Sequence, residues 1–307
     1  MEQVNFEVPD DEVAVDSVAH IHRWAAVKEV GMKILFLIAA AIFIAAVVVI
    51  CVYLFVGSVP AIAEIGFFEF LFGDRWIPGS GLYGIGSLIV GTIYSTAGAL
   101  VIGVPIGVLV AVFMAFYCPK WLYKILKPAM NILAGIPSIV YGYFGLSVIV
   151  PLVREWFGGS GLSLLATIFI LGVMILPTII SITETSLRAV PKSYYEGALA
   201  LGATKERAIF RTIFPAAKSG IVTAIILGLG RAFGETAAVT LICGNSASMP
   251  TSLIDPIRTL ASNIANDIGY GYSNDLTLGL LIGCALVLFV FILLITIIVM
   301  LLKKRSR

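Results

Sequence analysis

Charged side chains are scarce in this chain. Asp, Glu, Lys and Arg make up 12% of its 307 residues, whereas hydrophobic residues make up 60%. An ordinary soluble domain carries about 25% charged residues. The composition therefore excludes a soluble domain and predicts an integral membrane protein.

Motifs for nucleotide and metal binding are also missing. No G-x-x-x-x-G-K-[ST] run occurs, and the nearest fragment, Lys218-Ser219, follows Ala217 in place of glycine. The cysteines form no C-x-x-C pair and stand far apart, at Cys51, Cys118, Cys243 and Cys284. Neither a zinc site nor a disulfide framework is indicated. We expect no enzyme, no cofactor, no metal and no nucleic-acid partner, and ATP hydrolysis only in a separate subunit.

Long apolar runs dominate the rest of the chain. About 20 apolar residues in a helix cross roughly 30 Å of hydrocarbon. Six runs meet this requirement: Ile34–Val56, Tyr83–Tyr117, Ala129–Val153, Gly161–Thr183, Gly220–Cys243 and Leu276–Leu302. The predicted fold is an all-α membrane protein with six transmembrane helices in the lipid bilayer.

The basic residues set the expected orientation. With the N-terminus inside, 16 of the 20 Lys and Arg residues fall on the cytoplasmic side, where such residues accumulate. Both termini are then cytoplasmic. The predicted organisation is an acidic cytoplasmic segment at 1–33, a six-helix membrane domain at 34–302 with a cytoplasmic loop at 184–219, and a basic tail at 303–307. The acidic segment is expected to be a mobile, solvating tail, and a regulatory role stays open.

Two outer segments are expected between these helices. Ala61–Phe72 has apolar residues at near-helical spacing and predicts an amphipathic helix along the outer surface. The segment 244–275 is rich in Asn, Asp, Gly and Tyr. Its composition is typical of a solvated loop, with a lid or a partner contact as the alternative.

The third apolar run is interrupted at its middle by Gly135 and Pro137. Broken transmembrane helices occur where they pack on protein or line a cavity. Ser138 and Tyr141, just after the interruption, are therefore candidates for a transport path. A kink that serves packing alone is an equally good interpretation of the local sequence.

Arg231 and Glu235 are the only charged residues between Ser219 and Ile254. A charge at the centre of a bilayer costs about 2.5–3.5 kcal/mol on insertion scales, so ionisable residues there point to function. Four residues apart on a helix, the two side chains share one face. Thr236 and Thr240 lie near the same face and add hydroxyl groups.

The loop at 184–219 is the longest charged insertion in the chain. Pro191 is expected to start a first helix that Gly202 ends, and Ala203–Phe214 is expected to form a second helix that Pro215 stops. Such a hairpin suits either a protein surface or anionic lipid headgroups.

The run Glu196-Gly197-Ala198-Leu199-Ala200-Leu201-Gly202, with Pro215 thirteen positions later, resembles the EAA loop of bacterial ABC-importer permeases. In that family the loop is a short helix that docks into a groove of the ATPase subunit. The resemblance implies a coupling role for Glu196, Gly197, Ala198, Gly202 and Pro215. Two departures are Gly at the second position and an aliphatic anchor shifted by one residue.

The resemblance extends from Phe67 to the C-terminus, to the PstC-type permease subunit of phosphate ABC importers. It implies a heterodimer with a PstA-type permease, a dimer of PstB-type ATPases and an external PstS-type phosphate-binding protein. The matching runs are Gly91-Thr92-Ile93, Pro105-Ile106-Gly107, Leu133–Gly142, Gly230–Val239 and Gly244-Asn245.

A mechanism follows as a hypothesis. An Arg fork binds phosphate bidentately, and Glu235 is expected to pair with Arg231 at rest and to compete with the anion during passage. The alternative is a buried structural ion pair. Arg231 suits other tetrahedral oxyanions equally well, and a proton-coupled secondary transporter that uses Glu235, or a scaffold protein, are the remaining classes.

Overall fold

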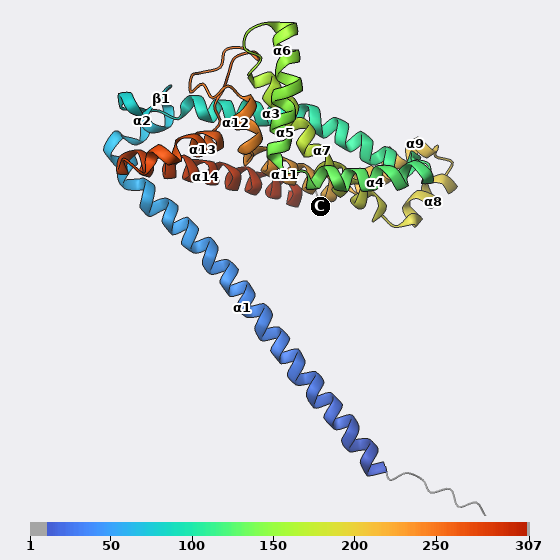
Figure 1. Ribbon diagram of the computed structural model, residues 1–307. Coiled ribbons are helices and arrows are strands. Elements are labelled where there is room, and N and C mark those ends of the chain that lie inside the picture. The colour runs from blue at the N-terminus through green and yellow to red at the C-terminus, as the bar shows by residue number, and fades with distance from the viewer. Residues whose placement is uncertain (1–10, 306–307) are drawn as a thin grey trace, which may run out of the picture. The chain divides into compact units, whose positions relative to one another are not determined.

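The computed structural model describes residues 11–305, and their side chains from 29 to 301. Helices account for nearly all of the ordered structure, together with one short antiparallel ribbon that pairs Trp76 with Tyr83 and Ile77 with Leu82 (Figure 1). The elements are α1 (Asp11–Ile65), α2 (Phe67–Phe72), β1 (Trp76–Ile77), η1 (Pro78–Ser80), β2 (Leu82–Tyr83), α3 (Gly86–Val112), η2 (Phe113–Tyr117), α4 (Lys120–Gly135), α5 (Ser138–Phe144), η3 (Gly145–Ile149), α6 (Val150–Phe157), α7 (Leu164–Arg188), α8 (Lys192–Ala200), α9 (Lys205–Ala208), η4 (Ile209–Ile213), α10 (Phe214–Ala216), α11 (Lys218–Phe233), α12 (Ala237–Ile242), α13 (Leu260–Gly271) and α14 (Asp275–Arg305). The short elements η2, η3 and η4 are π-helical turns.

Five segments are long and apolar enough to cross a membrane, and a sixth is obtained if one bent helix pair forms a single span. The predicted all-α membrane class is confirmed. The five are Glu29–Ile65, Gly86–Tyr117, Ser138–Phe157, Leu164–Arg188 and Asp275–Leu301. The bent pair joins Lys205–Ala216 to Lys218–Phe233 at an angle of 69°.

The third and fifth spans differ from the sequence-based boundaries. The third begins at Ser138, because Ile136 is extended before Pro137 and the chain breaks between α4 and α5. The helix that holds Arg231 ends at Phe233, and α12 starts only at Ala237. The third and the fifth predicted apolar runs therefore each contain a break in the helix.

The first span also departs from expectation. Helix α1 continues to Ile65, and Gly66, with φ of 101°, separates it from α2. The prediction of one amphipathic helix over Ala61–Phe72 was therefore wrong. Within α2, Phe70 is buried whereas Phe68 is 75% exposed.

The chain divides into two units, residues 1–54 and 55–307. In the first, α1 is helical from Asp11, so residues 11–33 of the acidic segment form helix where a mobile tail was expected. Residues 1–10 of that segment lie outside the described part. At the other end of the chain, α14 runs to Arg305, and 306–307 of the basic tail are likewise outside it.

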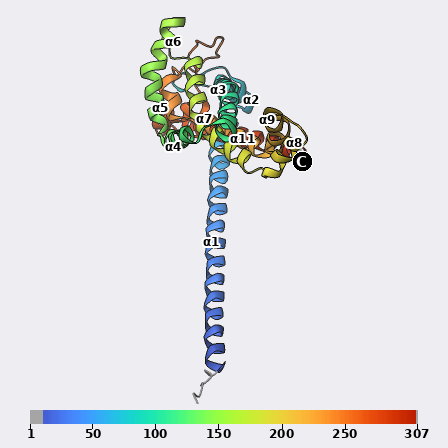
Figure 2. The same cartoon turned by 90° about the vertical axis from the view of Figure 1, so that its right-hand side faces the viewer.

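Helices α3 and α7 form the central contact of the second unit. Glycines of α3 face isoleucines of α7, and a Cβ at any of these glycines would lie within 2.8 Å of the facing side chain. The contacting pairs are Gly98 with Ile168, Gly103 with Ile175 and Gly107 with Ile179. Figure 2 shows α5 and α6 on one side of α7, and α8 and α9 on the other. Helix α7 thus lies between the region of α5 and α6 and the region of α8 and α9.

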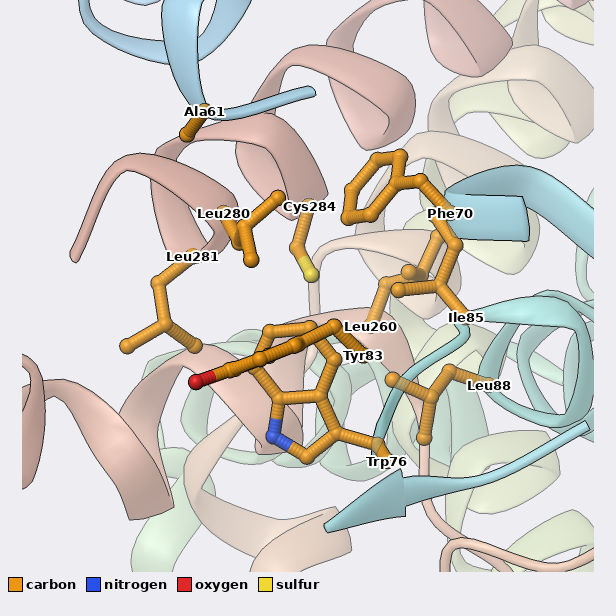
Figure 3. Close-up of a cluster of buried hydrophobic side chains, with 10 residues drawn as sticks. All are labelled: Ala61, Phe70, Trp76, Tyr83, Ile85, Leu88, Leu260, Leu280, Leu281 and Cys284. Atoms are coloured by element: carbon orange, nitrogen blue, oxygen red, sulfur yellow. The ribbon is translucent and has the colours of Figure 1, made fainter. Parts of the chain in front are cut away.

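A second apolar cluster lies at the start of α3 (Figure 3). Trp76 packs edge-on against Tyr83, with ring centroids 5.7 Å apart, and Leu88 of α3 and Leu280 of α14 complete the core. Aromatic pairs of this geometry add to the stabilisation from burial. The cluster joins the β ribbon to α3, α13 and α14.

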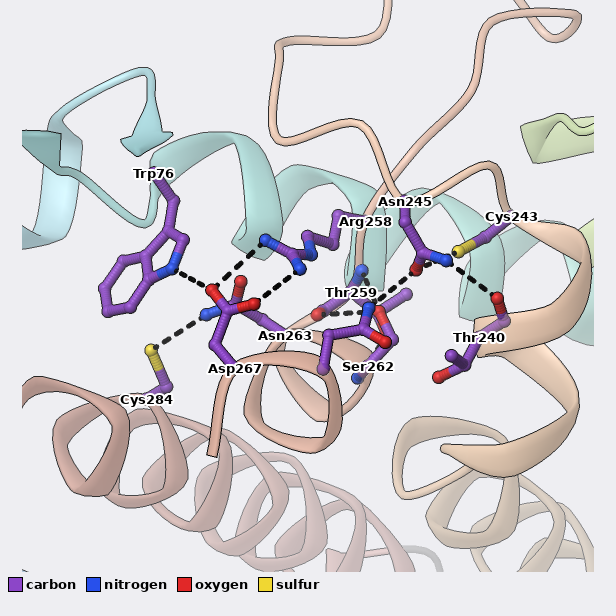
Figure 4. Close-up of polar contacts among 11 residues, drawn as sticks. Trp76, Thr240, Cys243, Asn245, Arg258, Thr259, Ser262, Asn263, Asp267 and Cys284 are labelled. Carbon is purple, nitrogen blue, oxygen red and sulfur yellow. Dashed lines mark hydrogen bonds and ion pairs between the residues drawn. The ribbon is translucent and has the colours of Figure 1, made fainter. Parts of the chain in front are cut away.

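The segment 244–275 is folded where a solvated loop was expected. Arg258, 12% exposed, forms an ion pair of 2.8 Å with Asp267 of α13, and the Trp76 indole N–H donates to the same carboxylate at 2.7 Å (Figure 4). Asn245 stands in the left-handed region, with φ of 52°. It donates to the carbonyl of Thr240 and accepts from Asn266. Polar residues here hold α13 against α12 and β1.

We predict that Gly142→Ala destabilises the protein. Its Cβ would lie 2.7 Å from the Cα of Ala238 on α12, so α5 and α12 must separate. Overpacking of this kind costs about 1–3 kcal/mol. Thermal unfolding in detergent measures the loss. Gly135→Ala is the control, because its Cβ meets no atom within 4 Å; equal melting of both variants would contradict the close contact.

Candidate functional site

Arg231 lies near the end of α11, two residues before the helix stops. Its guanidinium Nη1 donates to Thr178 Oγ1 of α7 at 3.4 Å, which is the only polar contact of this side chain within the described part of the chain. The Tyr141 hydroxyl is within electrostatic range of Arg231. A half-buried guanidinium with five donors and one long hydrogen bond retains most of its capacity to bind an anion.

Glu235 does not share a helix face with Arg231. It lies in the break between α11 and α12, where its Oε1 accepts a hydrogen bond of 3.1 Å from the Ala238 backbone N–H. No ion pair joins Arg231 to Glu235 among the residues that the structure describes. The expected pairing was wrong, because the carboxylate binds the first turn of α12 and the helical four-residue spacing does not apply.

The two threonines use their hydroxyl donors locally. Thr236 donates to the Gly234 carbonyl at 3.2 Å, and Thr240 donates to the Thr236 carbonyl at 2.8 Å. The Thr240 bond, to a carbonyl four residues back, is of a kind common in helices, and the Thr236 bond reaches two residues back within the break. In this arrangement both hydroxyls keep only acceptor lone pairs for a ligand.

Helix α5 brings the other two predicted residues to the same region. Ser138 is its first residue and is half-buried, and Tyr141 is buried with its hydroxyl donating to the Leu133 carbonyl of α4 at 2.8 Å. The next residue, Gly142, touches α12 at Ala238. The structure therefore places α5 against α12, with Arg231 near Tyr141.

The loop at 184–219 forms the expected hairpin with altered boundaries. Pro191 precedes α8, and Gly202, with φ of 83°, follows its end in the left-handed region. Thr204 caps α9 by accepting from the Arg207 N–H. Pro215 does not stop the second helix as predicted, since it stands in the first turn of α10, where no backbone donor is needed.

Helix α8 has no buried residue. Tyr194, Leu199 and Leu201 are exposed apolar side chains, with Leu201 91% exposed, and Glu196 is exposed beside them. An open groove of about 450 Å³ lies between α8 and η4, lined by Ala198, Leu201, Gly202, Ala203, Arg207, Arg211 and Thr212. Exposed apolar residues gathered on a short helix are typical of a protein contact.

Sequence reasoning missed a buried ionic cluster at the end of α7. Glu184, predicted as the first residue of the exposed loop, is 1% exposed. Its carboxylate accepts from Tyr123 at 2.7 Å, Lys127 at 2.7 Å and Arg188 at 2.8 Å. The bond to Glu184 raises the pKa of the Tyr123 phenol. Tyr123 and Lys127 are four residues apart, as are Glu184 and Arg188, so each pair shares a helix face, but no sequence signal indicates that the two faces meet.

Comparison with known proteins places this architecture among the permeases of ABC importers. The model of the family described as "Binding-protein-dependent transport system inner membrane component" matches residues 103–307, and the chain belongs to this family. It is a multi-pass inner-membrane component.

Curated relatives cover most of the chain. A probable ABC transporter permease protein, YqgH of Bacillus subtilis, is 38% identical over 276 residues, which is 87% of this chain and 89% of that protein. The phosphate transport system permease protein PstC of Pasteurella multocida is 36% identical over 253 residues, covering 76% and 78%. The chain is thus similar to both over most of its length.

Solved structures support the fold. An inward-facing form of the MetNI methionine ABC transporter matches with a TM-score of 0.55 at 24% identity, over 76% of this chain and 99% of that chain. A bacterial ABC transporter that imports alginate matches with a TM-score of 0.57 at 16% identity, over 80% and 93%. At these identities the likeness concerns the fold alone.

We predict that Glu235→Ala and Glu235→Gln distinguish the hydrogen-bond acceptor of this side chain from its negative charge. Alanine removes the acceptor for the Ala238 N–H and lowers the free energy of unfolding by about 0.5–2 kcal/mol. Glutamine keeps an oxygen acceptor and unfolds like the wild type. Denaturation of the purified protein in detergent distinguishes them, and equal losses would show that the cap is not what the carboxylate contributes to stability.

Proposed function

We propose that this chain is a permease subunit of an ATP-driven phosphate importer and forms half of the translocation path. The observation that carries the proposal is Arg231, a cation set in an apolar helix with a single long hydrogen bond. The similarity to proteins named as phosphate transport permeases supports phosphate as the anion.

The proposed path runs past Arg231, Glu235, Thr236 and Thr240 on one side and past Ser138 and Tyr141 on the other. Phosphate carries one to two negative charges at neutral pH and binds an Arg fork through two hydrogen bonds. Because Glu235 is engaged with α12 and not with Arg231, the guanidinium is available to the anion without first breaking an ion pair. The fixed negative charge of Glu235 near the path then favours release, since a site on a path must also let its ion leave.

In this proposal a separate ATPase dimer supplies the energy for transport and docks on α8. Glu196, Leu199 and Leu201 are exposed there and Gly197 leaves room for close approach. Helices α7 and α11 leave the two ends of this loop, so a push on α8 reaches Arg231 along a covalent route. Gly202 gives the loop its left-handed turn after α8, and Pro215 lies in α10, just before the bend into α11.

The remaining partners follow from the same proposal. They are a PstA-type sibling permease, a PstB-type ATPase dimer and an external PstS-type phosphate-binding protein. The distribution of basic residues supports a cytoplasmic position for α8 and both termini, so the ATPase docks inside and the binding protein outside.

We predict that Arg231→Gln lowers phosphate uptake about tenfold or more, because a charge-assisted hydrogen bond to the anion is lost. The assembled complex and its ATP hydrolysis remain. Radiolabelled uptake into proteoliposomes that contain the whole complex measures the effect, and Arg154→Gln, an exposed arginine of α6, is the control.

Loss of assembled complex in Arg231→Gln would instead support a structural role for this residue. Competition by sulfate separates the substrates: a complex that takes up sulfate and ignores phosphate would overturn phosphate as the substrate while leaving an oxyanion permease.

We predict that Glu196→Lys separates the ATPase from the permease or uncouples the two. The substitution reverses the charge at the centre of the proposed docking helix, where like-charge contacts oppose binding. Co-purification and binding-protein-stimulated ATP hydrolysis are the measurements. Glu155→Lys, an exposed position on α6, is the control. Normal co-purification together with normal stimulation in Glu196→Lys would rule out docking at α8.

A further inference from the structure

The buried carboxylate of Glu184 joins two helices that are distant in sequence, α4 and α7. Tyr123 and Lys127 reach it from α4, and Arg188 reaches it from the last turn of α7. The Arg188 guanidinium also lies over the Tyr123 ring, 4.7 Å from its centroid. One anion therefore holds two cations and a phenol in a fixed arrangement, which is the condition under which a buried charge is tolerated.

The cluster continues to the end of α3. Arg188 Nη2 donates to the Met114 carbonyl at 2.7 Å, in the π-helical turn η2. Lys205, the first residue of α9, donates to the Phe116 carbonyl of the same turn at 3.0 Å, and its ammonium lies 4.4 Å from the Tyr117 ring centroid. The loop that carries α8 and α9 is thus fastened to the same turn that Arg188 holds.

The cluster also leads toward the candidate path. Helix α4 begins at Lys120, beside Tyr123, and ends at Gly135; near that end the Leu133 carbonyl accepts the Tyr141 hydroxyl of α5. Helix α4, 16 residues long with Pro128 inside it, therefore carries both contacts on one helix. Polar contacts therefore run from α9 through η2, Arg188, Glu184 and α4 to Tyr141, whereas α7 and α11 connect the loop to Arg231 through the chain itself.

We propose that Glu184 is a positioning residue that couples the loop bearing α8 to α4, so that the wall of the path formed by α5 moves together with the wall formed by α11. The inference rests on the proposed function, and it adds a second route by which the loop acts on the path. Without Glu184, a push on the loop still displaces α11, but α5 no longer follows. ATP is then hydrolysed with little transport.

The test uses the whole complex in proteoliposomes with Glu184→Gln, which keeps the shape and removes the charge that binds Lys127 and Arg188. We expect ATP consumed per phosphate imported to rise about fivefold or more, the lower range of allosteric coupling. Glu155→Gln, an exposed glutamate of α6, is the matched control and keeps the wild-type ratio. A wild-type ratio in an assembled Glu184→Gln complex overturns the proposal.

A second measurement does not depend on the substrate. Ser138→Cys, with the half-buried Cys51 and Cys118 replaced by serine, reports on the first turn of α5 through its reaction with a water-soluble maleimide. We expect ATP to change the labelling rate in the wild-type background and not in Glu184→Gln. If the wild-type complex imports no phosphate, the proposed function fails, and the labelling still decides whether Glu184 transmits movement.

Glu184→Gln leaves Lys127 and Arg188 without their anion, and this can prevent assembly. The double variant Glu184→Gln with Lys127→Gln removes one of the two cations as well and serves in its place. An assembled double variant with a raised ATP cost and lost ATP-dependent labelling supports the proposal. Wild-type behaviour in the double variant, or failure of both variants to assemble, overturns it in favour of a structural cluster.

Discussion

Polar groups inside apolar helices must find partners within the protein, because the hydrocarbon around them offers none. The hydroxyls of Ser95, Thr167 and Thr296 meet this requirement by bonding to their own helix. Among the charges, Lys127 of α4 bonds to Glu184 of α7, and Asp267 of α13 bonds to Trp76 of β1 and to Arg258 in the loop before α13. These bonds fix which helices lie together, since packing of apolar side chains alone discriminates poorly among neighbours in lipid.

Arg231 departs from this rule. Its guanidinium has one long bond to Thr178, whereas the buried glutamate at the end of α7 is fully surrounded by donors. A charged side chain whose hydrogen bonds are all made within the protein is held in place, whereas one with few protein partners can still bind a ligand. The contrast supports the two proposed roles, positioning for Glu184 and anion binding for Arg231.

Much of the fold follows from the sequence, because it depends on local rules. Apolar length locates the spans, Pro137 lacks the N–H that would continue α4 into α5, and Gly202 permits the left-handed turn after α8. The site is harder to predict. The carboxylate of Glu235 competes for the backbone N–H of Ala238 and ends the helical spacing that would pair it with Arg231.

Tertiary contacts explain the other failures. The sequence predicts Glu184 to be a loop residue because its partners on α4 are 57 and 61 positions away and no local pattern joins them. The polar composition of 244–275 predicts a solvated loop because Trp76, whose indole N–H donates to Asp267, lies 191 positions earlier in the sequence. Distant partners of this kind are visible only once the helices are packed.

The glycine contacts between α3 and α7 have a mechanical consequence. Where a glycine meets an isoleucine with no space for a further carbon, there is little side-chain freedom that would let one helix slide along the other, and the pair behaves as a strut. Movement that widens the proposed path would then take place at breaks between helices, and three of these are 136–137, the bend before Lys218 and 234–236. Two of these three hinges flank Tyr141 and Arg231, so the protein bends where the anion is expected to pass.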